Sequence, residues 1–278
     1  MRLSGKRIIG LAALIVAVAI GVGGGYLLWG GAKDWYAVPN PATLPPGEAN
    51  DLIRYGHVLV VETAANIGRN AKDPALAYAG NDLNCTNCHI NAGLRPFAAP
   101  FVSTYTTYPM MVDDRVLTLA ERINGCMIRS MNGKPLPEDG REMQAFLAYM
   151  RYLGEGAPKG VRVAGMGLMP LQPPAEAPSA TRGETVYVAN CTRCHGAEGE
   201  GSPAEPPQVG FAVPPLWGDG AYNTAAGMAD IRTAAAFVHA NMPDGITWQD
   251  PMLSEQEAWD VAAYMNSMAR PKGPPRTD

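Results

Sequence analysis

Two copies of the pattern Cys-X-X-Cys-His constrain this chain more than any other feature. They are "CTNCH" at residues 85–89 and "CTRCH" at residues 191–195. One helical turn places both thiols along one edge of a porphyrin, and the adjacent histidine lies under the iron. A disulfide would not need the histidine, and a zinc site would need four ligands from this set. The pattern predicts two covalently bound haem c groups, held by Cys85, Cys88, His89, Cys191, Cys194 and His195.

The sequence around the two motifs repeats one plan. A helix is predicted before each motif, in "IRYGHVLVVET" with Gly56 and in "RGETVYVANC" with Gly183. An amphipathic helix is predicted at each end, in "PEDGREMQAFLAYMRYLG" and in "LSEQEAWDVAAYMNSMA". The apolar positions of these two helices are Met143, Phe146, Leu147 and Met150 in the first, and Trp259, Ala262, Ala263 and Tyr264 in the second.

This plan is typical of small class I cytochrome c domains. The sequence therefore predicts a mainly α fold with two tandem class I cytochrome c-like domains behind an N-terminal transmembrane helix. The first domain is expected over residues 48–156 and the second over 181–270. Residues 157–180 are rich in proline, glycine and alanine, and are expected to form a linker on the surface.

Residues 1–33 are expected to form a membrane anchor. Ile8–Trp29 is a run of 22 residues without a charged side chain, and as a helix it would span roughly 33 Å. Three cations precede this run, which favours a cytoplasmic N-terminus and exported haem domains. The expected location is thus the bacterial cytoplasmic membrane, single-pass, with the haem domains in the periplasm. A long cleaved signal peptide is the alternative.

The charge balance excludes one class of partner. Without the four basic residues of the first 33, the chain keeps 18 basic and 26 acidic side chains. Nucleic acid needs a basic footprint, so we expect no nucleic acid partner. An anionic substrate would need a locally basic pocket. Residues 115–134 provide one candidate, with four basic residues against Glu121.

The fifth cysteine, Cys126, belongs to neither motif. In class I domains the second axial ligand comes from a loop before the last helix. Met242 lies 22 residues before Tyr264, and Cys126 lies 23 residues before Tyr149. The alignment predicts Met242 as distal ligand of the second haem, with His239 one turn earlier as the alternative, and Cys126 as distal ligand of the first. A buried free cysteine is the other interpretation of Cys126.

Residues 48–270 resemble a known family, the diheme cytochrome c thiosulfate dehydrogenases. These enzymes join two thiosulfates into tetrathionate and can run in reverse. The stretches that carry the resemblance are "AGNDLNCTNCHINAG" (79–93), "LAERINGCMIRSMNGKPLP" (119–137), "VPPLWGDGAYNTAAGM" (213–228) and "AAAFVHANMP" (234–243). The resemblance implies that Cys126 ligates the first, catalytic haem, and that Arg122 and Ser130 lie near the substrate. The second haem would then transfer electrons.

Two positions depart from the family pattern. An arginine that usually stands about 14 positions before the ligand cysteine is replaced by Val112, which Asp113 and Asp114 follow. Two acids beside the site of a dianion would weaken its binding unless they point away. His239 stands where the family often has a lysine that can itself ligate the second haem.

The residues around Cys126 suit a sulfur oxyanion. Arg122, Cys126, Arg129 and Ser130 recur at spacings of three and four, so most can share a helical face. Arginine forks suit sulfonate oxygens, although the arginines could instead pair with haem propionates. As a thiolate ligand, Cys126 would lower the potential of the first haem, and as a nucleophile it would bond the substrate sulfur.

The expected reaction is oxidation of two thiosulfates, or of a related sulfur oxyanion, to tetrathionate. Electrons would pass through the second haem to an external acceptor, such as a soluble cytochrome c or a terminal oxidase. A membrane-bound diheme electron carrier without its own substrate is the alternative. The direction of the reaction stays open, because it depends on the haem potentials.

Overall fold

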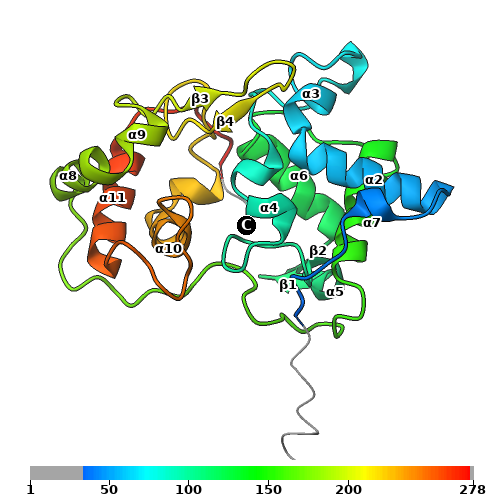
Figure 1. The fold of residues 1–278 in the computed structure, drawn as a ribbon, viewed down its shortest axis with the longest axis horizontal. Helices are drawn as coiled ribbons and strands as arrows, with labels where there is room; N and C mark the ends of the chain where they lie inside the picture. Colours follow the sequence, from blue (N-terminus) through cyan, green and yellow to red (C-terminus); the bar gives the residue numbers. More distant parts are fainter. Residues whose placement is uncertain (1–33, 276–278) are drawn as a thin grey trace, which may run out of the picture. The chain divides into compact units, whose positions relative to one another are not determined.

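The computed structural model describes residues 34–275, and this part of the chain is mainly helical. Figure 1 gives the order of the elements. The α-helices are α2 (Glu48–Val61), α3 (Thr63–Ile67), α4 (Ile90–Gly93), α5 (Thr104–Thr107), α6 (Leu119–Arg129), α7 (Arg141–Leu153), α8 (Ala180–Asn190), α9 (Thr192–His195), α10 (Ile231–Asn241) and α11 (Glu255–Ser267). Short 3-10 turns are η1 (Pro41–Thr43), η2 (Pro74–Leu76), η3 (Cys85–Asn87) and η4 (Gly227–Ala229).

The first haem motif lies in a domain built on the crossing of α2 and α7. Gly56 of α2 makes this crossing close: a Cβ atom there would lie 2.0 Å from the carbonyl oxygen of Ala145. The apolar face predicted for α7 is the face that packs, since Met143 and Phe146 are almost fully buried. Helix α6 joins the same hydrophobic core through Ile123 and Met127.

The second domain repeats this crossing with α8 and α11. A Cβ atom on Gly183 would lie 1.9 Å from the carbonyl oxygen of Asp260. Tyr187, Trp217 and Tyr264 form an aromatic cluster beside the crossing, with ring centroids 5.1 to 5.8 Å apart. In both domains the sequence therefore uses glycine where the first and last helices must approach closely.

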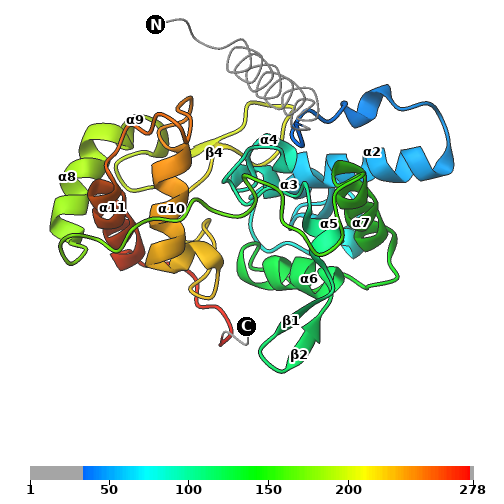
Figure 2. The ribbon, with the colours of Figure 1, turned by 90° about the horizontal axis from the view of Figure 1, so that it is seen from below.

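Two small antiparallel hairpins were not predicted from the sequence. β1 (Met110–Val112) pairs with β2 (Arg115–Leu117), and β3 (Ser202–Pro203) pairs with β4 (Phe211–Val213). Figure 2 shows the β1–β2 hairpin extending from the N-terminal end of α6. Strands of two or three residues carry too little periodicity to be recognised before the structure is known.

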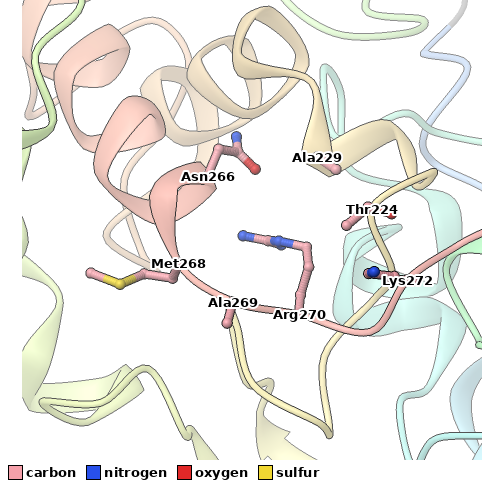
Figure 3. A pocket seen from close by; sticks show the side chains of 7 residues that line it. All are labelled: Thr224, Ala229, Asn266, Met268, Ala269, Arg270 and Lys272. Atoms are coloured by element: carbon pink, nitrogen blue, oxygen red, sulfur yellow. The ribbon is translucent and has the colours of Figure 1, made fainter.

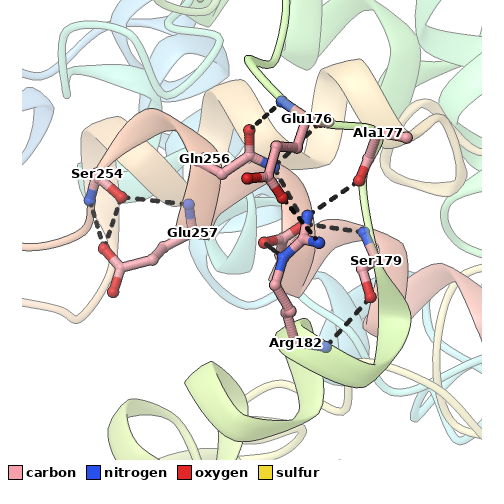
Figure 4. Close-up of polar contacts among 8 residues, drawn as sticks. Glu176, Ala177, Ser179, Arg182, Ser254, Gln256 and Glu257 are labelled. Carbon is pink, nitrogen blue, oxygen red and sulfur yellow. Dashed lines mark hydrogen bonds and ion pairs between the residues drawn. The ribbon is translucent and has the colours of Figure 1, made fainter.

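The segment between α7 and α8 contains no helix, and polar contacts hold its end against α11 (Figure 4). The Arg182 guanidinium donates to both carboxylate oxygens of Asp260, at 2.7 and 2.8 Å, and the Ser179 amide donates to the same carboxylate at 2.8 Å. Although burial by itself raises the pKa of Asp260, these hydrogen bonds lower it below its ordinary value. Asp260 is 3% exposed, so its charge is compensated where water is scarce.

Several hydrogen bonds join the two domains. The amide of Asn223 donates to the carbonyl of Arg129 at 3.1 Å, and the Asn132 side chain donates to the carbonyl of Ala221 at 2.7 Å. On another loop, the Asn241 side chain donates to the carbonyl of Phe97 at 3.1 Å. Segments 221–223 and 241 therefore tie the second domain to the surroundings of the first haem motif.

The predicted localisation, a single-pass protein of the cytoplasmic membrane, is corrected by the structure. Over residues 34–275 the structure has no helix that combines the length and the apolar character needed to cross a membrane. The anchor expected at residues 1–33, with its apolar run Ile8–Trp29, lies outside the described residues. The apolar run and the three cations before it carried that prediction, and no helix of residues 34–275 supports it.

Candidate haem sites and the surroundings of Cys126

The thiols of the first motif are half-buried in the first domain. Thr63, at the start of α3, is fully buried; its hydroxyl contacts the Cys85 sulfur at 3.3 Å and accepts the Cys85 amide at 3.0 Å. Burial raises the pKa of Cys85 to about 11 and that of Cys88 to about 12. Both thiols are therefore protonated and available for bonding to porphyrin vinyl groups at neutral pH.

A hydrogen bond to a loop carbonyl fixes the ring of His89. Its Nδ1 lies 2.6 Å from the carbonyl oxygen of Ala99, which leaves Nε2 as the atom that can ligate iron. Burial lowers the pKa of His89 to about 4, so the ring is neutral near pH 7, as a metal ligand must be. The Ala99 amide in turn donates to the carbonyl of Gly167 at 2.9 Å, so the interdomain segment supports this loop.

The second motif repeats this arrangement. Nδ1 of His195 lies 3.0 Å from the carbonyl oxygen of Pro214, and burial lowers the pKa of His195. Cys191 belongs to the edge of the second hydrophobic core, whereas Cys194 is exposed. No disulfide joins the cysteines of the described chain. In both motifs the donor set fits haem c: two free thiols and one neutral imidazole whose Nδ1 is already engaged.

Helix α6 brings Cys126 to the first motif. The helix begins in a capping box, in which Thr118 accepts the Glu121 amide and Glu121 accepts the Thr118 amide. Cys126 is half-buried and lies close enough to Cys85 and Cys88 for its charge to act on both thiols. The structure therefore brings together the leftover cysteine and the haem-attachment cysteines, 38 residues apart in sequence at the nearest.

The basic residues predicted near Cys126 lie on the same helix. Arg122 is exposed, and its charge acts on the His89 ring. Arg129 and Ser130 follow at the C-terminal end of α6, where the Ser130 amide donates to the carbonyl of Cys126 at 2.8 Å. The structure thus places Arg122 and Cys126 around one motif.

The two acids that depart from the family pattern lie on the β1–β2 hairpin. Asp113 and Asp114 connect the two strands, and both are exposed. Arg115, which follows them, lies 3.4 Å from Glu121 on the first turn of α6. Because the carboxylates are solvated, water screens their repulsion of an anion bound elsewhere.

The predicted distal residues of the second domain lie at the end of α10. Met242 directly follows this helix and packs in the same hydrophobic cluster as Cys191 and Trp217. His239, one turn earlier, is 6% exposed, and its Nδ1 is buried without a hydrogen-bond partner in the described part of the chain. Met242 therefore lies with the second motif, and His239 keeps an unused ring nitrogen nearby.

Some residues that shape the sites were missed by sequence reasoning. Thr63 positions Cys85, and the carbonyls of Ala99 and Pro214 orient the two histidines. Any residue provides a carbonyl, so the sequence holds no signal for the last two. Asn223 was also missed: its side chain donates to the carbonyl of Ile128 at 3.0 Å and accepts the Ala225 amide at 3.0 Å. The signal that could have pointed to Asn223 is its place in "AYNTAAG", which belongs to the stretch 213–228 that carries the family resemblance.

Both halves of the chain match family descriptions of cytochromes. Residues 78–158 match "SoxA/TsdA, cytochrome c domain", and residues 180–269 match "Cytochrome c". A cytochrome c domain therefore surrounds each motif, and the chain carries two covalently bound haem c groups.

The similar proteins that the comparisons found are called thiosulfate dehydrogenase. The chain is 36% identical to a thiosulfate dehydrogenase of Stutzerimonas stutzeri, over 88% of this chain and 76% of that protein. It is 38% identical to one of Allochromatium vinosum, over 84% of each. A solved structure, thiosulfate dehydrogenase (TsdBA) from Marichromatium purpuratum, superposes with a TM-score of 0.76 at 40% identity and covers 86% of this chain. This chain spans half the length of that protein.

The hydrogen bonds of the Asn223 side chain at the end of α6 give a testable prediction. Asn223→Ala leaves the Ile128 carbonyl and the Ala225 amide without partners, at a cost of about 2 kcal/mol. If the free energy of local opening at the end of α6 falls by this amount, the hydrogen-exchange rates of the Ser130 and Met131 amides rise roughly thirtyfold. Hydrogen-exchange mass spectrometry measures this rate. Asn190→Ala, which removes a bond to Val186 within α8, is the control. Equal exchange in both variants would contradict the role of Asn223.

Proposed function

This chain belongs to the thiosulfate dehydrogenase family, and from that premise we propose that it oxidises two thiosulfate anions to tetrathionate. The observation that carries the proposal is the placement of Cys126. This thiol is surplus to haem attachment, yet α6 holds it beside Cys85 and Cys88. A buried free cysteine of the core would not need the basic neighbours that α6 supplies.

The proposed haem ligands follow from the donor sets. Cys85 and Cys88 attach the first haem and His89 ligates it, whereas Cys191, Cys194 and His195 do the same for the second. Cys126 is the proposed distal ligand of the first haem. Met242 is the proposed distal ligand of the second, with His239 as its competitor. The hydrogen bonds of Ala99 and Pro214 support both histidine assignments, because they leave Nε2 toward the metal.

The proposed chemistry starts at the sulfur of Cys126. Its thiolate bonds the outer sulfur of thiosulfate, which gives a cysteine S-thiosulfonate and releases two electrons. When bound, the two haem c groups supply the one-electron acceptors for these electrons. A second thiosulfate then attacks the thiosulfate-derived sulfur of the adduct. This step forms the central sulfur–sulfur bond of tetrathionate, breaks the bond to Cys126 and restores the thiolate.

The neighbours of Cys126 hold the anion in this proposal. Arg122 binds the sulfonate oxygens of thiosulfate, since a guanidinium can donate two parallel hydrogen bonds. Ser130 contributes a hydroxyl donor one helical turn after Cys126. Arg129 either joins them or pairs with a haem carboxylate. The positive charge of these residues stands out in a chain of net charge −4 and favours a dianion at this site.

We also propose a division of labour between domains. Residues 48–156 carry the catalytic haem, 157–180 form a linker, and 181–270 carry the electron-transfer haem. The two family matches, at 78–158 and 180–269, support this division. An external acceptor, such as a soluble cytochrome c or a terminal oxidase, takes electrons at the second domain.

The proposed ligands give a prediction for the second haem. Met242→Ala should abolish the near-infrared charge-transfer band of His/Met ligation, because Met242 packs beside Cys191. His239→Ala should leave this band in place. Both oxidation states need to be measured, since reduction could exchange the two ligands. Persistence of the band in Met242→Ala, with its loss in His239→Ala, would reverse the assignment.

The proposed role of Cys126 gives a prediction that tests tetrathionate formation. Cys126→Met should retain both haems, because attachment needs only the motif cysteines and histidines. A thioether ligates iron but cannot form an S-thiosulfonate, so tetrathionate formation should fall at least about a thousandfold. Tetrathionate is measured directly, with an excess of artificial electron acceptor. If Cys126→Met turns over at the wild-type rate, Cys126 is at most a haem ligand. That result would favour the alternative of an electron carrier.

A further inference from the structure

A cavity of about 260 Å³ lies beside the C-terminal end of α11. Figure 3 shows the side chains of Asn266 and Arg270 projecting into this space. Lys272 also lines the cavity, and among the described residues none of the lining side chains is acidic. The cavity is therefore basic, within a chain that has more acidic than basic residues.

Asn266 carries two polar atoms that nothing in the described chain satisfies. Its Nδ2 and its Oδ1 are both buried, and neither has a hydrogen-bond partner. A buried amide group without a hydrogen-bond partner destabilises the fold, so such a pair points to a ligand that is absent from the polypeptide. The ligand has to accept a hydrogen bond from Nδ2.

Arg270 is fixed in place without a carboxylate. Its guanidinium donates to the carbonyl of Leu216 at 3.2 Å and to the carbonyl of Met265, and it lies 4.5 Å from the ring centroid of Tyr222. These contacts use neutral partners only. Within residues 34–275, none of the ion pairs involves Arg270. A half-buried guanidinium in this position favours an anion beside it.

The backbone links Arg270 to the second haem motif. Leu216, which accepts from Arg270, lies two residues after Pro214, whose carbonyl orients His195. The Gly218 amide donates to the carbonyl of Ala269 at 2.8 Å, directly before Arg270. The loop that holds the proximal histidine of the second domain is thus bonded to the segment that carries this cation.

We propose that the cavity binds a carboxylate of the haem in the second domain, with Arg270 as its counter-cation and Asn266 Nδ2 as a hydrogen-bond donor. Haem carries two propionate carboxylates, which match the charge and the acceptor that the cavity lacks. The proposal rests on the two haem c groups and is independent of the substrate.

This placement gives Arg270 a measurable effect. Reduction adds one negative charge to a haem, and a nearby cation stabilises that state. Arg270 therefore raises the reduction potential of the second haem, and a carboxylate left without it would lower that potential. An exposed arginine of the same domain, such as Arg232 on α10, is screened by water and has little effect.

Spectroelectrochemical titration of the holoprotein without thiosulfate tests the proposal. Arg270→Gln should lower the reduced-to-oxidised ratio of the second haem about tenfold at a fixed potential, which is about 59 mV for one electron. Arg270→Lys should restore most of the ratio, and Arg232→Gln should match the wild type. If Arg270→Gln matches Arg232→Gln, or if only the first haem shifts, the proposal is wrong.

Asn266→Leu provides a second variant if Arg270→Gln does not retain haem. It removes the donor and keeps the cation, so the ratio should fall in the same direction by a smaller factor. An unchanged ratio would contradict the proposed hydrogen bond.

A sulfate titration at constant ionic strength distinguishes the two sources of anion. If a haem carboxylate occupies the cavity, the reduction potential of the second haem in the wild type does not depend on the sulfate concentration. A sulfate-dependent shift in the wild type that Arg270→Gln removes would assign the cavity to a free anion and overturn the proposal. Either result leaves the thiosulfate reaction untouched, because no substrate is present.

Discussion

The helix that carries Cys126 is held at its C-terminal end by the other domain, and the geometry of the site depends on this bond. The last carbonyls of a helix have no partners within it, so they need donors from elsewhere. The amide of Asn223 donates to Arg129, and its side chain donates to Ile128. At its other end α6 is closed by its own capping box, from Thr118 and Glu121. The carbonyls at the end of α6 therefore find these donors only when both domains are folded together.

The same loop of the second domain also lies near the first motif. Tyr222 directly precedes Asn223, and its ring stacks on Arg270. Burial raises the pKa of Tyr222, and the Cys88 thiol is close enough to add to this effect, whereas Arg270 opposes it. A few residues thus connect the thiols of one haem motif with the basic cavity of the other domain.

Much of the architecture could be predicted from the sequence. The motif spacing identified two haem c domains, and the apolar positions of α7 and α11 identified their last helices. Cys126 was singled out because four cysteines were already explained, and the structure does place it beside Cys85 and Cys88. The two haem c domains and their last helices could be predicted because they rest on a residue type that the chemistry requires and on a strong helical period. The role of Cys126 as a haem ligand stays a prediction.

Other features depend on contacts that no local pattern encodes. The carbonyls of Ala99 and Pro214 orient the histidines, but any side chain could stand there. The contacts of Asn223 and Arg270 arise only when the second domain meets α6 and its own loops. The localisation failed for a different reason: it rested on an apolar run and the cations before it, and the described helices provide no membrane span.

The central claim is that the sulfur of Cys126 bonds the substrate. Peptide mass spectrometry of the oxidised holoprotein after brief thiosulfate treatment, quenched in acid without a reducing agent, tests it most directly. The account predicts a peptide containing Cys126 whose mass is increased by one bound thiosulfate group, and loss of the addition on treatment with a thiol reductant. Prompt tetrathionate formation with Cys126 unmodified at every time point would contradict it.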